Sequence, residues 1–233
     1  MGGLFGSTTI STTDTRINSM RIQQSAYGLC QPLVYGKTRV AANMFWYGDF
    51  TATPHTTVQK SGGKGGSTKT SNTIFSYSAS LMLGLCENQI KKIGLIWVDK
   101  DQYITKQEGS ITLDPIDQLK FELFDGNNNP PWGWLVSKHP EQAINYPYLG
   151  YVACANYEMG NSASLSNHNF EVISTITLSD SIDDANPADV IEDFITHPRH
   201  GAAPNLNMAD LEEFRTYCRA ANLLISPAFT EQR

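Results

Sequence analysis

Residues 73–99, TIFSYSASLMLGLCENQIKKIGLIWVD, decide the fold class of this chain. Apolar and aromatic side chains alternate with serines in the first half, at Phe75, Tyr77, Ala79 and Leu81. A period of two is typical of a strand with one buried face. A turn is expected at Glu87 and Asn88, and a second apolar run occupies residues 92–99. Two strands joined by so short a connection are predicted to be antiparallel neighbours.

Strand-like segments continue on both sides of this pair. β-branched and aromatic residues bounded by turn residues occupy 21–55, 148–157 and 169–178. Gly36 and Lys37 are predicted to form a turn inside the first of these segments. The run DGNNNPP over 125–131 predicts a long turn that neither a helix nor a central strand could contain.

Two helices are expected after about residue 180. Asn186 and Pro187 have the residue types of an N-cap and a first helical position. An apolar stripe follows at Val190, Ile191, Phe194 and Ile195. A second helix is expected to start near Asn207, with one face formed by Leu211, Phe214, Cys218 and Ala221 and with Asn222 as its C-terminal cap. The predicted fold class is α+β: mainly antiparallel β in barrel- or sandwich-like domains, with two amphipathic helices near the C-terminus.

Three regions are predicted. Residues 1–20 are small and polar and are expected to form an extended N-terminal arm that becomes ordered on another surface. Residues 21–180 form a β-rich region, interrupted by a flexible Gly/Ser/Thr loop at 60–72 that carries Lys60, Lys64 and Lys69. Residues 181–233 form a helical segment, expected to be the start of a further domain.

Composition narrows the class of protein. The 233 residues include 40% hydrophobic and 17% charged residues, with a net charge of −6. The charged share lies below the ~25% of an average soluble domain, as expected if neighbouring subunits cover much of the surface. The acidic balance argues against a dedicated nucleic-acid binder. No apolar run approaches the ~20 residues of a membrane span, and the N-terminus lacks the pattern of a secretory signal.

The motifs of enzymes and cofactor sites are missing or incomplete. The cysteines, at 30, 86, 154 and 218, contain no close pair, and buried reduced thiols are expected. Lys69 follows Thr68 instead of glycine, and Lys64 precedes glycine, so the Gly/Lys loop is not a phosphate-binding P-loop. His197 and His200 flank a proline, and a cationic turn at a helix end is favoured over a metal site. No cofactor, metal or catalytic residue is predicted.

Two further groups of residues have both a functional and a structural interpretation. Four acids occupy a linker and a first helical turn, Asp180, Asp183, Asp184 and Asp189, where capping alone favours them. A glycosidase pair among them is neither excluded nor supported. Trp132 and Trp134 are interpreted as interface aromatics, with sugar binding as an equal alternative. The lysines of the 60–72 loop are predicted to contact a partner.

Four blocks of the sequence, in order, resemble one protein family. The blocks are QPLVYGKTRVAANMFWYGDFTA (31–52), residues 77–100, residues 131–172, and ADVIEDFITHPRHGA (188–202) with YCRAANLLISP (217–227). They are similar to the N-terminal region of the tail-tip, or baseplate, hub and host-specificity tail proteins of long-tailed phages and gene transfer agents. Hub proteins of this kind are usually much longer, so either a short variant or the N-terminal domains of a larger polypeptide are expected.

The resemblance implies a structural, non-enzymatic role in the virion. A hub subunit of this kind forms a ring, commonly a trimer, that closes the tail tube and opens when DNA passes. Its implied partners are sister subunits, the distal tail protein, the tape measure and the tail fibre. DNA is expected only in transit through the lumen, and no stable membrane association is expected before infection. The implied location is the phage tail tip, with assembly in the host cytoplasm.

Two other classes of function stay open. One is a peripheral receptor- or carbohydrate-binding tail module, which would bind host cells as an isolated chain. The other is a tail-associated cell-wall hydrolase, which would lose activity when an acid such as Asp183 is replaced by Asn.

Overall fold

The computed structural model describes residues 7–20, 30–63 and 66–230. The chain divides into two compact units. Unit 1 contains residues 1–23, 47–81 and 155–166, and unit 2 contains residues 24–46, 82–154 and 167–233. This division differs from the predicted one, because the two C-terminal helices share a unit with strands from the first half of the chain.

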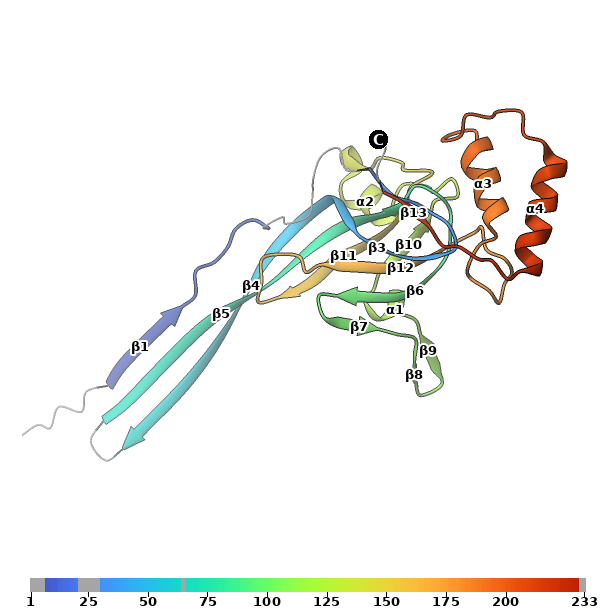
Figure 1. Cartoon of the computed structure of the whole chain (residues 1–233). Coiled ribbons are helices and arrows are strands. Elements are labelled where there is room, and N and C mark those ends of the chain that lie inside the picture. The colour runs from blue at the N-terminus through green and yellow to red at the C-terminus, as the bar shows by residue number, and fades with distance from the viewer. Residues whose placement is uncertain (1–6, 21–29, 64–65, 231–233) are drawn as a thin grey trace, which may run out of the picture. The chain divides into compact units, whose positions relative to one another are not determined.

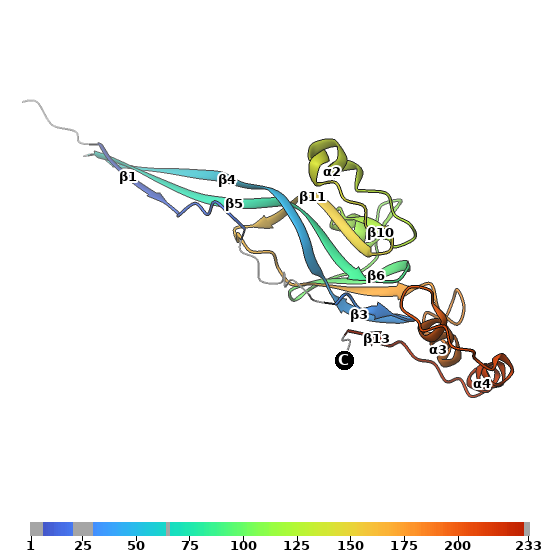
Figure 2. The ribbon, with the colours of Figure 1, turned by 90° about the horizontal axis from the view of Figure 1, so that it is seen from above.

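Unit 1 is built around the hairpin of β4 (Asn43–Gly63) and β5 (Gly66–Cys86), which pair with each other. Only two residues connect them, so they run antiparallel. Strand β1 (Ser7–Thr13) lies beside β5 in both views and pairs with it in parallel (Figures 1 and 2). The end of β11 (Gly150–Gly160) also belongs to this unit. Strands β4, β5 and β11 each contribute residues to both units.

Two predictions for this region need correction. Strand continues over most of the predicted 60–72 loop, because Ser, Thr and Lys side chains alternate freely on the two solvated faces of a hairpin. Residues 7–13 of the predicted arm form β1, whose partner is β5 of the same chain. Residues 1–6 and 21–29, and Lys64 and Gly65, lie outside the described residues.

The centre of unit 2 is an antiparallel sheet in the order β3-β12-β6-β7. Its strands are β3 (Lys37–Ala41), β12 (His168–Ser174), β6 (Ile90–Val98) and β7 (Asp101–Tyr103). Strand β6 therefore pairs with β12 and β7 and not with β5, so the predicted pairing of the two runs in residues 73–99 is wrong. Many of the largest buried side chains lie in this unit, among them Tyr35, Ile96, Tyr151 and Phe170.

Shorter elements complete unit 2. Besides the antiparallel sheet, the unit holds two two-stranded sheets, one edge pair of the five-stranded sheet that also includes β5 and β1, and a set of short helices. They are β2 (Leu33–Val34) with β13 (Ala228–Phe229), β8 (Lys106–Glu108) with β9 (Ile111–Leu113), β10 (Glu122–Asp125) with the start of β11, α1 (Pro115–Gln118), α2 (Gly133–Lys138) and the 3-10 turn Pro140–Gln142. The predicted turn over 125–131 falls between β10 and α2.

Both predicted helices are present, and they lie side by side (Figures 1 and 2). Helix α3 (Pro187–Thr196) has Asn186 as its N-cap, whose side chain accepts a hydrogen bond from the Ala188 N–H at 2.9 Å. Helix α4 (Met208–Ala220) is capped by Asn207 in the same way. Asn222 has a φ of +50°, the left-handed conformation expected just beyond a helix C-terminus.

The apolar stripes of these helices are only partly buried. Val190 of α3 and Cys218 of α4 are buried, whereas Phe194 and Phe214 remain exposed. The fold is mostly β with few helices, and over the described residues no sheet closes into a barrel, so the barrel alternative is wrong. None of the helices in the described part of the chain is long and apolar enough to cross a membrane.

Arg215 joins the two helices. Its Nε lies 2.5 Å from Asp189 Oδ1 of α3, and its other nitrogens pair with Glu192 of α3 and Glu212 of α4. The Arg215 side chain is only 12% exposed. One guanidinium with several donors can serve three carboxylates at once, which a point charge on lysine could not do with the same geometry.

Replacing Arg215 with Met should lower the free energy of unfolding by about 1–2 kcal/mol, because three carboxylates lose their shared cation. Urea denaturation followed by circular dichroism measures the loss. The matched control is Arg219→Met, an exposed arginine in the last turn of α4, for which a change under about 0.5 kcal/mol is expected. Equal losses in the two variants would contradict this role of Arg215.

Candidate functional site

A cavity of about 380 Å³ lies in unit 2 beside the end of α3. Five separate segments form its wall. They are the turn after β5 (87–89), the loop residues 126–127, Tyr148, residues 175–176 after β12, and Asp193 with the turn 197–200. A smaller cavity of about 200 Å³ shares Glu87, Tyr148 and Arg199 with the first. The arrangement brings together residues that are distant in sequence.

The turn after α3 is held tightly against the helix. The His197 N–H donates to the Asp193 carbonyl at 2.9 Å, and the Gly201 N–H donates to the His197 carbonyl at 2.8 Å. A Cβ at Gly201 would lie 2.4 Å from the Ile195 carbonyl oxygen, so only glycine fits this approach. The turn therefore presents both histidines to the cavity in a fixed way.

A buried tyrosine anchors the cluster from the strand side. Tyr35 is fully buried, and its hydroxyl donates to Asp193 Oδ2 at 2.7 Å. Burial, together with the hydrogen bond and charge of Asp193, raises the pKa of Tyr35 far above its usual value. The phenol consequently stays protonated and acts as a permanent donor to Asp193.

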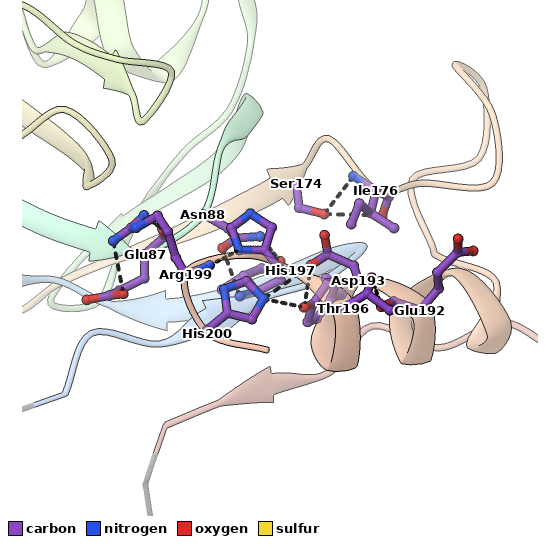
Figure 3. A network of polar contacts seen from close by, with 12 residues as sticks. Glu87, Asn88, Ser174, Ile176, Glu192, Asp193, Thr196, His197, Arg199 and His200 are labelled. Atoms are coloured by element: carbon purple, nitrogen blue, oxygen red, sulfur yellow. Dashed lines mark hydrogen bonds and ion pairs between the residues drawn. The ribbon is translucent and has the colours of Figure 1, made fainter. Parts of the chain in front are cut away.

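The two histidines stack on one another at the cavity wall (Figure 3). Their ring centroids are 4.0 Å apart, and His200 Nε2 lies 3.4 Å from Asp193 Oδ2. Burial lowers the pKa of His200 below its ordinary value of 6.5, and the neighbouring His197 lowers it further, against the opposing effect of Asp193. Neutral imidazole is therefore the favoured form of His200 at neutral pH.

Arg199 occupies the boundary between the two cavities. Its guanidinium lies 3.6 Å from the Glu87 carboxylate (Figure 3). Its central carbon lies 4.4 Å from the Tyr148 ring centroid. A cation over an aromatic face is attracted by the ring quadrupole. Glu87 and the Tyr148 ring thus already balance the positive charge of Arg199.

The geometry provides hydrogen-bonding groups around a hollow. No group of three or more His, Cys, Asp or Glu side chains among the described residues is placed to hold a metal ion. The predicted turn with His197 and His200 is present at the end of α3, but the lowered pKa of His200 favours a neutral ring there instead of the expected cation. The arrangement can orient a polar ligand through donors and acceptors on several sides.

The predicted partner-contact lysines lie elsewhere, in unit 1. Lys60 is on β4 and Lys69 is on β5, and both side chains are exposed. Lys64 lies outside the described residues. Sequence reasoning placed these lysines in a loop, whereas the two described ones stand on strands.

The two tryptophans differ in their accessibility. Trp132 is fully buried, and its indole N–H donates to Glu122 Oε1 at 3.0 Å. It cannot present its ring to a partner, which corrects the prediction for this residue. Trp134 is partly exposed and stacks on Trp132 with centroids 4.7 Å apart, beside Trp46.

The four acids singled out by sequence bind different partners. Asp180 pairs with Lys91 at 2.9 Å and Asp183 with Lys92 at 3.1 Å. Asp184 accepts a hydrogen bond from the Ser226 hydroxyl at 2.5 Å, while Asp189 pairs with Arg215. The Lys91 ammonium lowers the pKa of Asp180. Each acid has a structural partner, which accounts for the cluster without a pair of catalytic carboxylates.

The cysteines are free, as the sequence predicts. Cys86, Cys154 and Cys218 are buried, and burial raises the pKa of Cys86 to about 12 and that of Cys154 to about 11. Such thiols are poor nucleophiles. Cys30 departs from the prediction, because it is exposed.

Sequence reasoning identified His197 and His200 but missed the residues that surround them. Tyr35 and Asp193 are 158 positions apart, and Glu87 and Arg199 are 112 apart. Of these four, only Arg199 lies in a recognisable local pattern. The one usable signal was the HPRH turn at the end of a predicted helix.

Comparison with known proteins gave one structural match of note. A chain from the structure described as the virion of a native gene transfer agent (GTA) particle aligns with a TM-score of 0.46 at 18% sequence identity. The alignment covers 93% of this chain and 49% of that one, so the chain spans about half the length of the protein it matches. No protein-family model and no curated protein sequence matches the chain.

The histidine pair predicts a pH dependence of stability. Because the pKa of His200 is lower in the folded state than its ordinary 6.5, the native state binds fewer protons than the unfolded state just below that pH. The contribution of His200 to the free energy of unfolding should therefore be fully present above pH 6.5. It should fall as the pH is lowered through the folded-state pKa of His200. Thermal unfolding between pH 7.5 and about 5 measures the trend.

Three variants identify the source of that dependence. Asp193→Asn should lower the pKa of His200 further, since it removes the favourable charge, and His197→Ala should raise it. NMR titration of the imidazole protons reports both shifts. A His200→Gln variant that keeps the full decline in stability on acidification would show that other groups cause it.

Proposed function

We propose that this chain is a non-enzymatic structural subunit of the tail tip of a long-tailed phage or a related gene transfer particle. The resemblance of the four sequence blocks to tail-tip hub proteins suggests the family. The exposed hairpin of unit 1 is the observation that carries the proposal of an assembled subunit. The proposal does not rest on the structural match, whose TM-score is 0.46.

The far part of the hairpin buries too little surface to be explained as part of a free monomer, whereas residues 81–86 of β5 are buried. Every side chain over residues 53–62 of β4 is exposed, including Val58, and Ile10 of the neighbouring β1 is 50% exposed. Strands without a buried apolar face gain little stability in water, and ordering each residue costs about 1–2 kcal/mol of backbone entropy. A ribbon of two 21-residue strands is most simply explained by a partner surface that covers it.

The charge of the hairpin points to the same kind of partner. Residues 50–86 contain three lysines and no acidic residue, within a chain whose net charge is −6. Opposite charges on different parts of one subunit favour association between copies, because a basic segment of one copy can face an acidic surface of the next. This supports a homo-oligomer, and the resemblance suggests a trimeric ring.

The helical pair offers a second surface for assembly. Phe194 and Ile191 of α3 and Tyr217 of α4 are between 40% and 61% exposed. Exposed apolar groups of this size on neighbouring elements are typical of interaction sites. In the proposed assembly, other tail proteins cover this surface.

The proposed subunit acts by position and not by chemistry. In a ring it would close the tail tube, connect the tape measure, the distal tail protein and the receptor-binding fibre, and open for DNA ejection. It would be located in the virion, after assembly in the host cytoplasm, without a cofactor and without stable membrane association before infection. DNA would meet it only in transit.

Substitution in the hairpin tests the proposal. Val58→Asp places an acid on the lysine-bearing hairpin and should abolish incorporation into particles, while the chain keeps its thermal unfolding temperature. Incorporation is measured by mass spectrometry of purified particles from a host that supplies the variant. The matched control is Ile111→Asp, on the exposed β8–β9 hairpin of unit 2, which should assemble normally.

The oligomeric state of the chain and its location can each contradict the proposed role. A wild-type chain that stays monomeric at high concentration and is missing from particles would contradict a hub. Binding of the isolated chain to host cells, without binding to tail proteins, would favour the peripheral receptor-binding module. Peptidoglycan cleavage that is lost in Asp183→Asn would favour the hydrolase.

A further inference from the structure

Three neutral polar side chains that line the larger cavity are exposed or half-buried and have no hydrogen-bond partner among the described residues. Gln89, Asn127 and Thr175 face it from three segments. Within the described part of the chain, their side chains take part in no hydrogen bond, although the Thr175 N–H donates to the Gln89 carbonyl. Amides and hydroxyls both donate and accept, so these groups are available to a ligand that does the same.

The charged groups of the wall are already matched within it. Arg199 pairs with Glu87, and Asp193 accepts from Tyr35 and lies beside His200. An anionic ligand would face Glu87 and Asp193 at close range, and a cation would face Arg199. The side chains that remain available to a ligand are uncharged, and they therefore favour a neutral ligand.

The cavity also has an apolar side. Ile176, Pro198 and Tyr148 contribute to the same wall. Its volume of about 380 Å³ lies near the small end of ligand pockets, which span roughly 300–1,000 Å³. A pyranose ring has this combination of features: a compact body with C–H groups on its faces and hydroxyls around its edge.

We propose that this cavity binds a neutral pyranose sugar through Gln89, Asn127 and Thr175. The adjoining cavity of about 200 Å³ shares Glu87, Tyr148 and Arg199 with it, so a second sugar unit has space next to the first. The ligand is accordingly a unit of a glycan chain. None of the residues of this site lies on the β4–β5 hairpin, the feature that carries the assembly proposal.

Saturation-transfer NMR on the full chain tests the site. The probes are D-glucose, D-galactose, D-mannose and N-acetyl-D-glucosamine, together with maltotriose and chitotriose. At least one sugar should bind with a Kd of about 1–10 mM, in the range of a few hydrogen bonds to a shallow pocket. A trisaccharide that binds more tightly than its monosaccharide indicates a glycan chain as the source, whereas equal affinities indicate a free sugar.

Matched variants separate the site from non-specific effects. The double variant Gln89→Ala and Asn127→Ala should weaken binding by about tenfold or more, because two hydrogen-bonding amides are lost. The control is Gln59→Ala with Asn161→Ala, which removes two exposed amides in unit 1 and should change nothing. Thermal unfolding confirms that both doubles are folded.

Three results would overturn the site. They are the lack of any sugar signal at about 50 mM probe, far above the expected Kd, equal binding by the two double variants, or displacement of the sugar by sodium sulfate. The last would identify an anion site at Arg199. None of these results bears on whether the chain enters particles, so failure here is distinguishable from failure of the assembly proposal.

Discussion

The burial of one phenol organises unit 2. Tyr35 packs with Leu33, Ala185 and Val190 in one core cluster, and its hydroxyl would be costly to bury without a partner. Asp193 supplies that partner and thereby fixes α3 against the β2–β3 connection. The turn after α3 and its histidines are placed as a consequence, so the cavity depends on this hydrogen bond even though Tyr35 is not part of its wall.

The same region shows how little freedom the packing leaves. Gly36 follows Tyr35 with a φ of +63°, and a Cβ there would lie 2.3 Å from Ser226 Oγ. That hydroxyl accepts from the Lys37 N–H and donates to Asp184. A single glycine thus lets the chain turn where the C-terminal segment and the start of α3 approach β3. Any larger residue at position 36 would push the C-terminal segment, the start of α3 and β3 apart.

Unit 1 is stabilised differently. Its described buried apolar residues are few, Met20, Tyr77, Ala79, Leu81 and Ala163, and the rest of its hairpin is solvated. Backbone pairing with β1 and cross-strand contacts such as His55 with Ser76 hold the strands together. Backbone pairing gives little sequence-specific register when both faces are polar. This weakness is what makes an external partner necessary in the proposed assembly.

The sequence alone determined the features that depend on neighbours along the chain. Asn186 with Pro187, Asn207, the left-handed Asn222 and the turn at Glu87 were all predictable, because capping and turn formation involve residues a few positions apart. The strand character of residues 73–86 and of the run that follows was also predictable from alternation.

Only the tertiary structure decided which of these elements meet. The alternation in β5 and β6 does not reveal that β6 pairs with β12, since a period of two specifies a buried face but not its partner. Nor does any local pattern bring Asp193 to Tyr35, bury Trp132, or unite the amides of Gln89 and Asn127 around one hollow. Those placements follow from the burial of apolar surface between distant segments, a force that is non-directional and therefore not encoded in any short stretch of residues.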